Sequence, residues 1–195
     1  KDSEGKIIIA DKITYTKSKE FLLAEGNVKI TDIQKNVITA DKATYDKINE
    51  IIITYDRTEI LLKEGYRLVS KNVSYDIEKK IVLSNDNSIF TDTEGNYIET
   101  TMFQYHIKNN LFSSVGKIKV IDIKKNKYFF KELHVDTKKK EIVGSEVSVI
   151  LDQTNFGVSK ESDPRFAANN IYMSKDKTDL SKGIFTVCKQ RNGKC

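Results

Sequence analysis

Apolar and polar residues alternate along most of the chain, and the alternation returns every 30 residues. The first mark of the repeat is an apolar pair two positions apart, Ile13 and Tyr15. The later pairs at this interval are Ala43 and Tyr45, Val73 and Tyr75, Phe103 and Tyr105, and Leu133 and Val135. Alternation with a period of two predicts half-buried β-strands. A fixed interval without insertions predicts one structural unit stacked repeatedly.

Polar segments separate the strands and divide each repeat into a short strand, a turn, a longer strand and a second turn. One set of turns comes directly after the apolar pairs, at 16–19, 46–49, 76–80, 108–110 and 136–140. A second set lies at the other end of each unit, at 32–36, 64–65, 94–96 and 124–126. Gly26, Gly116 and Gly144 fall midway along longer strands, where a glycine predicts a bulge or bend.

The period is interrupted after Val135. A sixth return would fall on Asp163 and Arg165, which do not fit the apolar pair, and the segment 152–166 has loop composition. Strand-like patterns resume at 168–173 and 183–188, and no amphipathic helix is evident. We therefore predict an all-β domain over 1–187, with regular repeats to about 152 and an irregular final unit over 153–187. Residues 188–195 would form a short connector that contains cysteine.

Two architectures fit a repeated hairpin of this length. The units can stack in a line as a β-solenoid, or successive hairpins can zigzag between two facing sheets as a flattened β-jelly-roll. Either arrangement is open at both ends. The terminal strands then present unpaired edges, to which a strand of another chain can be added.

Composition excludes several classes of protein. The chain has 195 residues, of which 38% are hydrophobic and 31% are charged, so it can bury a core of its own. Its net charge of +5 comes from 33 basic and 28 acidic residues that are well mixed. Nucleic-acid binding would require clustered basic residues with exposed aromatic residues, and we expect none. No apolar run approaches the about 20 residues of a membrane-spanning helix, and no signal peptide is visible.

Catalytic motifs are absent from the sequence. His106 borders a turn, and His134 alternates with the apolar pair Leu133 and Val135, so it points to the opposite face. No nucleophile elbow and no glycine-rich phosphate loop occurs. Aspartates gather at turn starts, where they cap the backbone; calcium ligation is the alternative. We predict a protein that is not an enzyme and that has no cofactor and no metal.

With no catalytic motif in the sequence, the interior of the stack is the candidate functional site. The apolar side chains could pack as a solid core, or they could line a channel for an apolar ligand, with each tyrosine hydroxyl near a polar partner or a wet edge. The candidate lining consists of the apolar pairs and the inward residues of the longer strands: Ile13, Tyr15, Val28, Ile30, Ala43, Tyr45, Ile60, Leu62, Val73, Tyr75, Phe103, Tyr105, Ile118, Val120, Leu133, Val135, Val147 and Val149.

The segment 163–195 resembles the end of the N-terminal periplasmic domain of the LptD family, the outer-membrane lipopolysaccharide-assembly proteins. The family string of Lys-Gly, an aliphatic residue, an aromatic residue, Thr and then Cys is matched by Lys182, Gly183, Ile184, Phe185, Thr186 and Cys188. Cys195 fits the second cysteine of the family, after which the β-barrel of those proteins begins. The repeat strings AEGNVKIT (24–31) and ADKATY (40–45) are similar to those of the OstA-like domains shared by LptA, LptC and LptD.

The resemblance implies a β-jelly-roll whose interior holds the acyl chains of lipid A. It implies edge-strand docking of an LptA-like jelly-roll at the N-terminal edge. It also implies transfer of lipopolysaccharide to the protein's own C-terminal β-barrel, which LptE plugs, at the periplasmic face of the outer membrane. In that family cysteines join this domain to the far end of the barrel, a role that would fall to Cys188 and Cys195. A local bridge between the two cysteines is the alternative, and an oxidising periplasm suits either.

Two other functions compete with this one. The first is a separate periplasmic bridge protein of the LptA or LptC type, with the same fold and no barrel. The second is a structural β-solenoid with a solid core. The paired cysteines of the tail favour the LptD resemblance, and we expect the chain to be a piece of a longer protein. The sequence beyond Cys195 discriminates between the first two.

Overall fold

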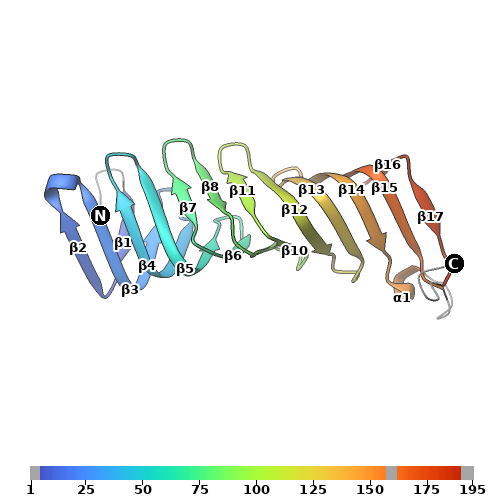
Figure 1. Ribbon diagram of the computed structural model, residues 1–195, viewed down its shortest axis with the longest axis horizontal. Coiled ribbons are helices and arrows are strands. Elements are labelled where there is room, and N and C mark those ends of the chain that lie inside the picture. The colour runs from blue at the N-terminus through green and yellow to red at the C-terminus, as the bar shows by residue number, and fades with distance from the viewer. Residues whose placement is uncertain (1–4, 157–161, 190–195) are drawn as a thin grey trace.

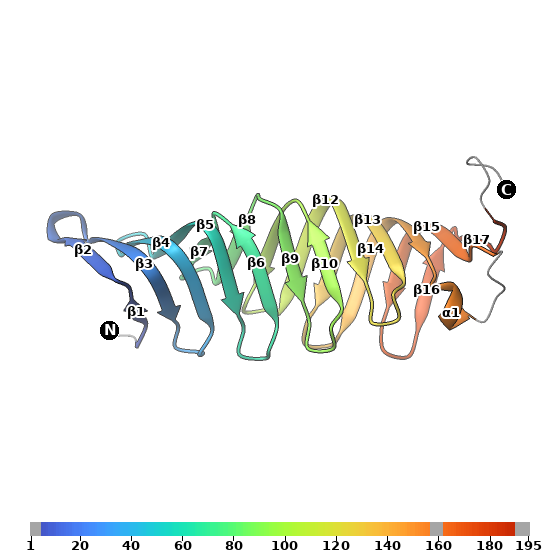
Figure 2. The same cartoon turned by 90° about the horizontal axis from the view of Figure 1, so that it is seen from below.

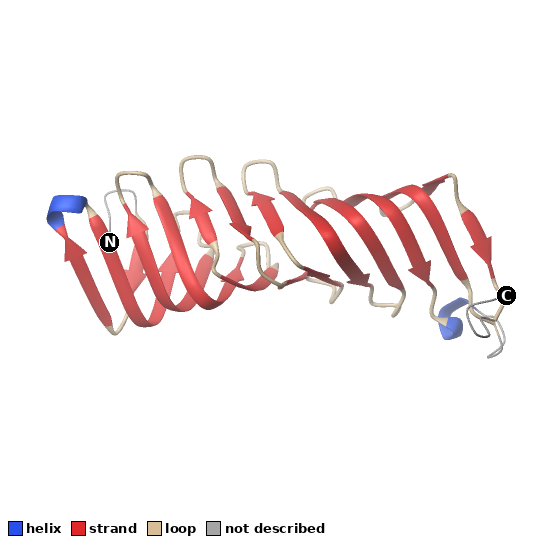
Figure 3. Ribbon diagram, viewed as in Figure 1, coloured by secondary structure: helices blue, strands red, loops and turns tan. Residues whose placement is uncertain are grey.

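The computed structural model describes residues 5–156 and 162–189 and is an elongated array of β-strands (Figures 1 and 3). The strands succeed one another along the long axis, so that the first and last strands lie at opposite ends (Figure 1). The prediction of an all-β chain is confirmed. The short α-helix α1 (Gln153–Phe156) and a 3-10 turn, Lys17–Lys19, were not predicted by the alternation.

Long strands occupy both ends of the array, and pairs of short strands occupy its middle. The long strands are β3 (Phe21–Thr31), β4 (Val37–Asp46), β5 (Ile51–Leu61), β12 (Leu111–Ile121), β13 (Lys127–Asp136), β14 (Glu141–Ile150) and β15 (Arg165–Met173). The short strands of the middle are β6 (Arg67–Lys71), β7 (Ser74–Asp76), β8 (Ile81–Ser84), β9 (Ser88–Thr91), β10 (Tyr97–Thr100) and β11 (Phe103–His106). The terminal short strands are β1 (Ile7–Ile9), β2 (Lys12–Thr16), β16 (Thr178–Ser181) and β17 (Ile184–Thr186).

All strand pairs are antiparallel, and each long strand belongs to two layers. β3, for example, pairs with β1 through Lys29–Thr31 and with β2 through Phe21–Glu25. Layer A contains β1, β6, β9, β10, β17 and one half of every long strand; layer B contains β2, β7, β8, β11, β16 and the other halves. Figure 2 shows β6, β9 and β10 side by side in layer A. The zigzag jelly-roll is therefore confirmed over the linear solenoid.

Both ends of the stack are open, as predicted. β1 and β2 each pair only with β3, and β16 and β17 each pair only with β15, among the strands that the structure describes. Within residues 5–156 and 162–189, no further strand pairs with the outer edges of these four strands.

The two layers meet along a bend that crosses the middle of every long strand. Gly26 and Gly116 take positive φ values of 75° and 110° there, as predicted. The prediction that Gly144 marks a bend is wrong, because the positive φ of β14 falls at Glu146, at 47°. Gly144 serves packing instead, because a Cβ at this position would clash with Cδ1 of Phe130.

A single apolar core lies between the layers. Phe90 projects from layer A and Phe112 from layer B, and their ring centroids are 5.0 Å apart. The layers are therefore in direct contact through their inward side chains.

Hydrogen-bonded turns line both rims of the array, at the strand ends farthest from the bend. On the layer A rim the amide oxygens of Asn36, Asn96 and Asn126 accept hydrogen bonds from the backbone N–H groups of Lys63, Ile123 and Asp152, at 2.8–2.9 Å. On the layer B rim the turns are joined by backbone bonds, as from Thr137 N to Asn110 O at 2.9 Å. Most turns thus hold the turn of the next hairpin, which fixes the stacking interval.

Candidate functional site

The interior is lined by two continuous rows of inward side chains, one on each layer. Row A crosses the strands of layer A from β1 to β17 in register. Its members are Ile8, Ile30, Ile38, Ile60, Leu68, Phe90, Ile98, Val120, Tyr128, Val149, Phe166 and Phe185. Since adjacent strands lie about 4.8 Å apart, the row extends over about 50 Å. It holds no charged residue.

Row B crosses layer B from β2 to β15. Its members are Tyr15, Leu22, Tyr45, Ile52, Tyr75, Val82, Tyr105, Phe112, Val135, Ile142 and Met173. Every member is apolar or aromatic. Two facing rows of this kind give the interior the chemistry of a hydrocarbon track.

The predicted lining residues occupy these rows and the positions nearer the bend. Four lie in row A: Ile30, Ile60, Val120 and Val149. Five lie in row B: Tyr15, Tyr45, Tyr75, Tyr105 and Val135. Nearer the bend are Ile13, Val28, Ala43, Val73, Phe103, Ile118, Leu133 and Val147, and Leu62 lies in the turn after β5.

The predicted residues on the terminal strand β2 are exposed, whereas those on the strands farther along the stack are buried or half-buried. Ile13 and Tyr15 are 46% and 50% exposed because β2 is the terminal strand of layer B. Val135 is half-buried, and the remaining predicted residues are buried. The structure therefore brings the predicted set together along one interior.

Sequence reasoning missed eight of the twelve residues of row A and six of the eleven residues of row B. Ten of the omitted residues recur at the same 30-residue interval as those that were found: Ile8, Ile38, Leu68, Ile98 and Tyr128 in row A, and Leu22, Ile52, Val82, Phe112 and Ile142 in row B. Tracing the period from position 8 or 22, rather than from the Tyr15 pair alone, would have identified them.

Buried hydroxyl groups replace apolar side chains near the bend in the middle of the stack. Thr58 donates to Thr54 at 2.7 Å, and the hydroxyls of Ser70 and Ser88 lie 2.6 Å apart. Ser84 donates to the carbonyl oxygen of Lys71 at 2.6 Å. These short side chains satisfy polar groups where β6 to β11 break at the bend. These buried hydroxyls lie near the bend and not in rows A and B, so both rows consist of apolar and aromatic side chains.

Tyrosine hydroxyls reach the rims, where polar partners are available. Tyr105 lies 3.2 Å from Thr137 Oγ1, and Tyr128 donates to Asp122 Oδ2 at 3.0 Å. Burial raises the pKa of Tyr75 to about 12 and also raises the pKa values of Tyr105 and Tyr128. These three tyrosines are therefore uncharged at neutral pH, and their rings add to the apolar lining.

Aromatic rings fill the middle of the interior. Tyr66 stacks on Phe90 with ring centroids 5.5 Å apart, and Phe90 continues to Phe112, which stacks on Phe103 at 6.0 Å. We call Tyr66, Phe90, Phe103 and Phe112 the aromatic cluster. It spans both layers, so a ligand that travels the whole track must displace rings here.

Two contacts join turns of the layer A rim to a turn of the layer B rim. The hydroxyl of Tyr66, in the turn between β5 and β6, donates to the carbonyl oxygen of Thr137 at 2.8 Å. Lys140 forms an ion pair with Glu94, in the turn between β9 and β10. Thr137 and Lys140 both belong to the turn between β13 and β14. We call these two contacts the clasp, because they hold layer A against layer B.

The N-terminal end of the interior opens into a cavity of about 450 Å³. Its apolar walls come from both rows and include Ile8, Tyr15 and Ile52. Lys6 is only 6% exposed and places its Nζ 3.3 Å from the hydroxyl of Tyr45, and Lys47 pairs with Glu20 at 3.2 Å. This mouth combines an apolar floor with ammonium groups.

Catalytic and metal-binding arrangements are not found in the described part of the chain. No group of three or more His, Cys, Asp or Glu side chains within it could hold a metal ion. His134 faces outward, with Nδ1 at 2.9 Å from Ser113 and Nε2 at 3.0 Å from Glu132. The turn aspartates cap backbone, as Asp32 does for Asn36 at 2.8 Å.

Cys188 is half-buried beside Arg165, whose guanidinium donates to the Cys188 carbonyl oxygen at 2.7 Å. Cys195 lies outside the described residues, and both predicted disulfides involve it or a partner beyond the chain. None of the helices within 5–156 and 162–189 is long and apolar enough to span a bilayer.

No protein-family model matches the chain, and no curated protein matches it in sequence. Among solved structures, the chain is similar to LptH, the LptA-homologous periplasmic component of the lipopolysaccharide transport device of Pseudomonas aeruginosa. The identity is 15%, the alignment covers 73% of this chain and 82% of LptH, and the TM-score is 0.30. At this level of similarity, inference about function has to come from the residues of the chain itself.

Proposed function

We propose that this protein is a non-catalytic periplasmic carrier that conducts the acyl chains of lipopolysaccharide through its interior. The observation that supports this most directly is the pair of apolar rows. Row A runs between the two open ends of the stack, and row B runs from β2 to β15, where the polar Thr178 of β16 follows Met173. An enzyme would need a constellation of reactive groups. A carrier needs a continuous apolar surface and a way in and out.

The energetics of the rows suit transport better than storage. Leaving an acyl chain in water costs about 0.8 kcal/mol per CH₂ group, so a lipid with several chains needs a continuous shield. A repeat of nearly identical layers offers many positions of similar free energy. The lipid can then advance by one strand spacing at a time without a deep trap.

The finer proposal is that the chain is the N-terminal domain of an LptD-type lipopolysaccharide translocon. It rests on the tail residues Lys182 to Thr186 and the two cysteines. In this proposal 1–187 form one domain and 188–195 the connector. An LptA-like jelly-roll docks on the edge of β1 and β2, and the barrel with LptE receives the lipid. The domain acts at the periplasmic face of the outer membrane.

A bridge protein of the LptA or LptC type fits the rows and the open edges equally well. The two assignments differ in the coding sequence downstream of Cys195: a translocon gene continues into barrel sequence, whereas a bridge gene ends soon afterwards. Reading the gene beyond codon 195 separates them.

The solid-core alternative draws support from the aromatic cluster, which fills the middle of the interior. A photoreactive benzophenone side chain at Tyr75 or Tyr105, both inward and buried and neither of them lining the concavity at the outside of layer A, tests it. We expect adducts with lipopolysaccharide at both positions. A benzophenone at Val143, which is outward and 48% exposed, is the matched control. Adducts at Val143 alone, or at none of the three, would leave the solid core as the better account.

A further inference from the structure

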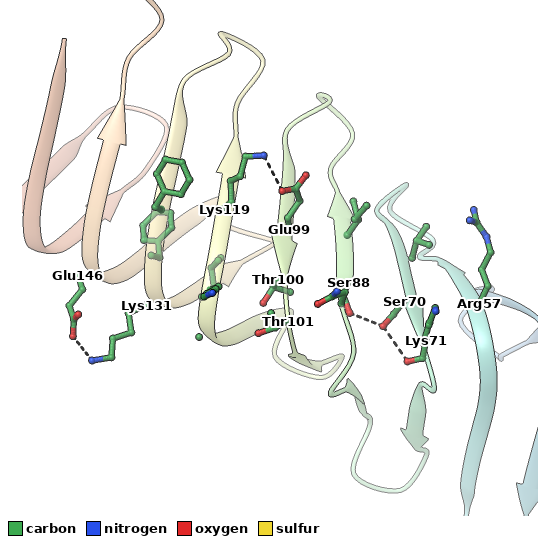
Figure 4. Close-up of a pocket in the computed structure, with 18 residues that line it drawn as sticks. Arg57, Ser70, Lys71, Ser88, Glu99, Thr100, Thr101, Lys119, Lys131 and Glu146 are labelled. Atoms are coloured by element: carbon green, nitrogen blue, oxygen red, sulfur yellow. Dashed lines mark hydrogen bonds and ion pairs between the residues drawn. The ribbon is translucent and has the colours of Figure 1, made fainter. Parts of the chain in front are cut away.

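A second concavity, of about 930 Å³, lies on the outside of layer A beside the bend (Figure 4). It extends from Arg57 in β5 to Glu146 in β14. Its volume falls within the range of about 300–1,000 Å³ that is typical of small-molecule sites. We call it the outer groove.

The floor of the outer groove is apolar although it faces away from the core. Val69, Ile89 and Phe129 are outward residues of β6, β9 and β13, and Val69 and Ile89 are paired neighbours. Ile89 is 45% exposed and Phe129 is 37% exposed. Water-exposed apolar side chains that share one concavity favour an apolar ligand.

The rim of the outer groove carries an excess of positive charge. Its two carboxylates are already paired, Glu99 with Lys119 at 3.0 Å and Glu146 with Lys131 at 2.6 Å (Figure 4). Three further cations, Arg57, Lys71 and Lys117, line the groove and are exposed. No ion pair is found for these three within the described residues. The nearby Glu59 carboxylate is bound by Arg67 instead.

We propose that the outer groove binds an anionic amphiphile with a single acyl chain. The chain would lie on Val69, Ile89 and Phe129, and the anionic head group would be held by Lys71, Lys117 and Arg57. The three floor residues point away from the core, but the buried Ile118 and Phe130 of the core also line the groove, so the site adjoins the interior near the bend. The proposal does not depend on the proposed carrier function.

The backbone of the groove argues against an extended peptide as the occupant. β9 is paired on both sides, with β6 and with β10, and β10 is paired on to β12. No strand edge is therefore available to satisfy the N–H and C=O groups of an added strand. An acyl chain has no such groups to satisfy, so the apolar floor alone can hold it.

Photo-crosslinking of the whole chain with dodecyl phosphate, below its micelle concentration, tests the proposal. With benzophenone in place of Phe129 we expect a dodecyl phosphate adduct that weakens as salt is raised, because exposed charges are screened. Dodecyl maltoside has the same acyl-like chain and a neutral head group, and its adduct yield at position 129 should be at least fivefold lower. Equal yields from the two amphiphiles, or no adduct at position 129, would overturn the proposal.

Charge reversal assigns the head-group site. We expect Lys71→Glu with Lys117→Glu to lower the adduct yield at position 129 at least fivefold. Lys108→Glu with Lys138→Glu changes the net charge equally at turns of layer B and should leave the yield unchanged. An equal loss from both pairs would contradict a specific site. Benzophenone at Tyr75 in the same variants reports the interior separately, so a failure of the carrier function and a failure of the groove give different results.

Discussion

At the scale of single residues, the fit between layers depends on the absence of a side chain at Gly144. Phe130 is buried in layer A, and its ring edge occupies the space that a Cβ of residue 144 would need. Because the φ of Gly144 is not positive, alanine is compatible with its backbone. The cost of a substitution is therefore steric.

We expect Gly144→Ala to destabilise the protein by about 1–3 kcal/mol, as overpacking of a core does. Chemical denaturation monitored by circular dichroism measures this loss. Phe130→Leu shortens the ring that causes the clash. The double variant should therefore lose less stability than the sum of the two single variants. Additive losses would mean that the ring of Phe130 is not the obstacle.

Single positions could be predicted only where the repeat itself carries the signal. The inward direction of Tyr45, Tyr75 and Tyr105 comes from alternation and is confirmed by their burial. The role of Gly144 depends on the ring of Phe130 in the adjacent strand. The sequence pattern does not show which residue of that strand lies against Gly144. A bend was the natural expectation there, and the bend lies two residues later.

At the scale of elements, Tyr66 stands where the ladder of rim asparagines has a gap. Asn36, Asn96 and Asn126 recur with the 30-residue period and hold the next turn. The position of that series between Asn36 and Asn96 is Tyr66, whose hydroxyl crosses to the opposite rim at Thr137. One turn thus gives up a contact along its own rim and closes the clasp instead.

The clasp should resist separation of the layers, which lipid entry would require under the proposed carrier function. We expect Tyr66→Phe to cost about 1 kcal/mol of stability, as the loss of one buried hydrogen bond does, and to speed the uptake of lipopolysaccharide. Stopped-flow binding kinetics measure the rate of uptake. Tyr172→Phe removes a hydrogen bond to Glu141 of 3.1 Å that does not join the rims and is the control. Similar rates for both variants would deny the clasp a gating role.

The sequence predicts that longer strands break midway near a small or polar residue, but it does not show that the breaks fall in the middle of the stack, where they divide β6 to β11 into short pairs. The alternation continues through this region, but Ser70, Ser84 and Ser88 bring hydroxyls to the bend. Serine hydroxyls can form hydrogen bonds with backbone groups that lose their partners in the sheet. The strands can therefore be interrupted at the bend. The helix α1 was missed for a different reason, because four residues are too few to show a helical period.

At the scale of the whole molecule, the twist between layers decides which turns meet. Tyr66 and Thr137 are 71 residues apart, more than two repeats. Strand twist accumulates along a stack, so a turn of one layer faces a turn well beyond its own repeat in the other. A 30-residue period predicts the stack and its open ends, but it contains no information about this offset.

The central claim is that the apolar rows form one continuous track for acyl chains. The most direct test is a benzophenone scan along row B at Tyr15, Tyr75, Tyr105 and Val135, each paired with the preceding, outward residue: Thr14, Ser74, Gln104 and His134. A continuous track should give lipopolysaccharide adducts of comparable yield at all four inward positions and at none of the outward ones. Adducts confined to Tyr15, or equal yields at inward and outward positions, would contradict it.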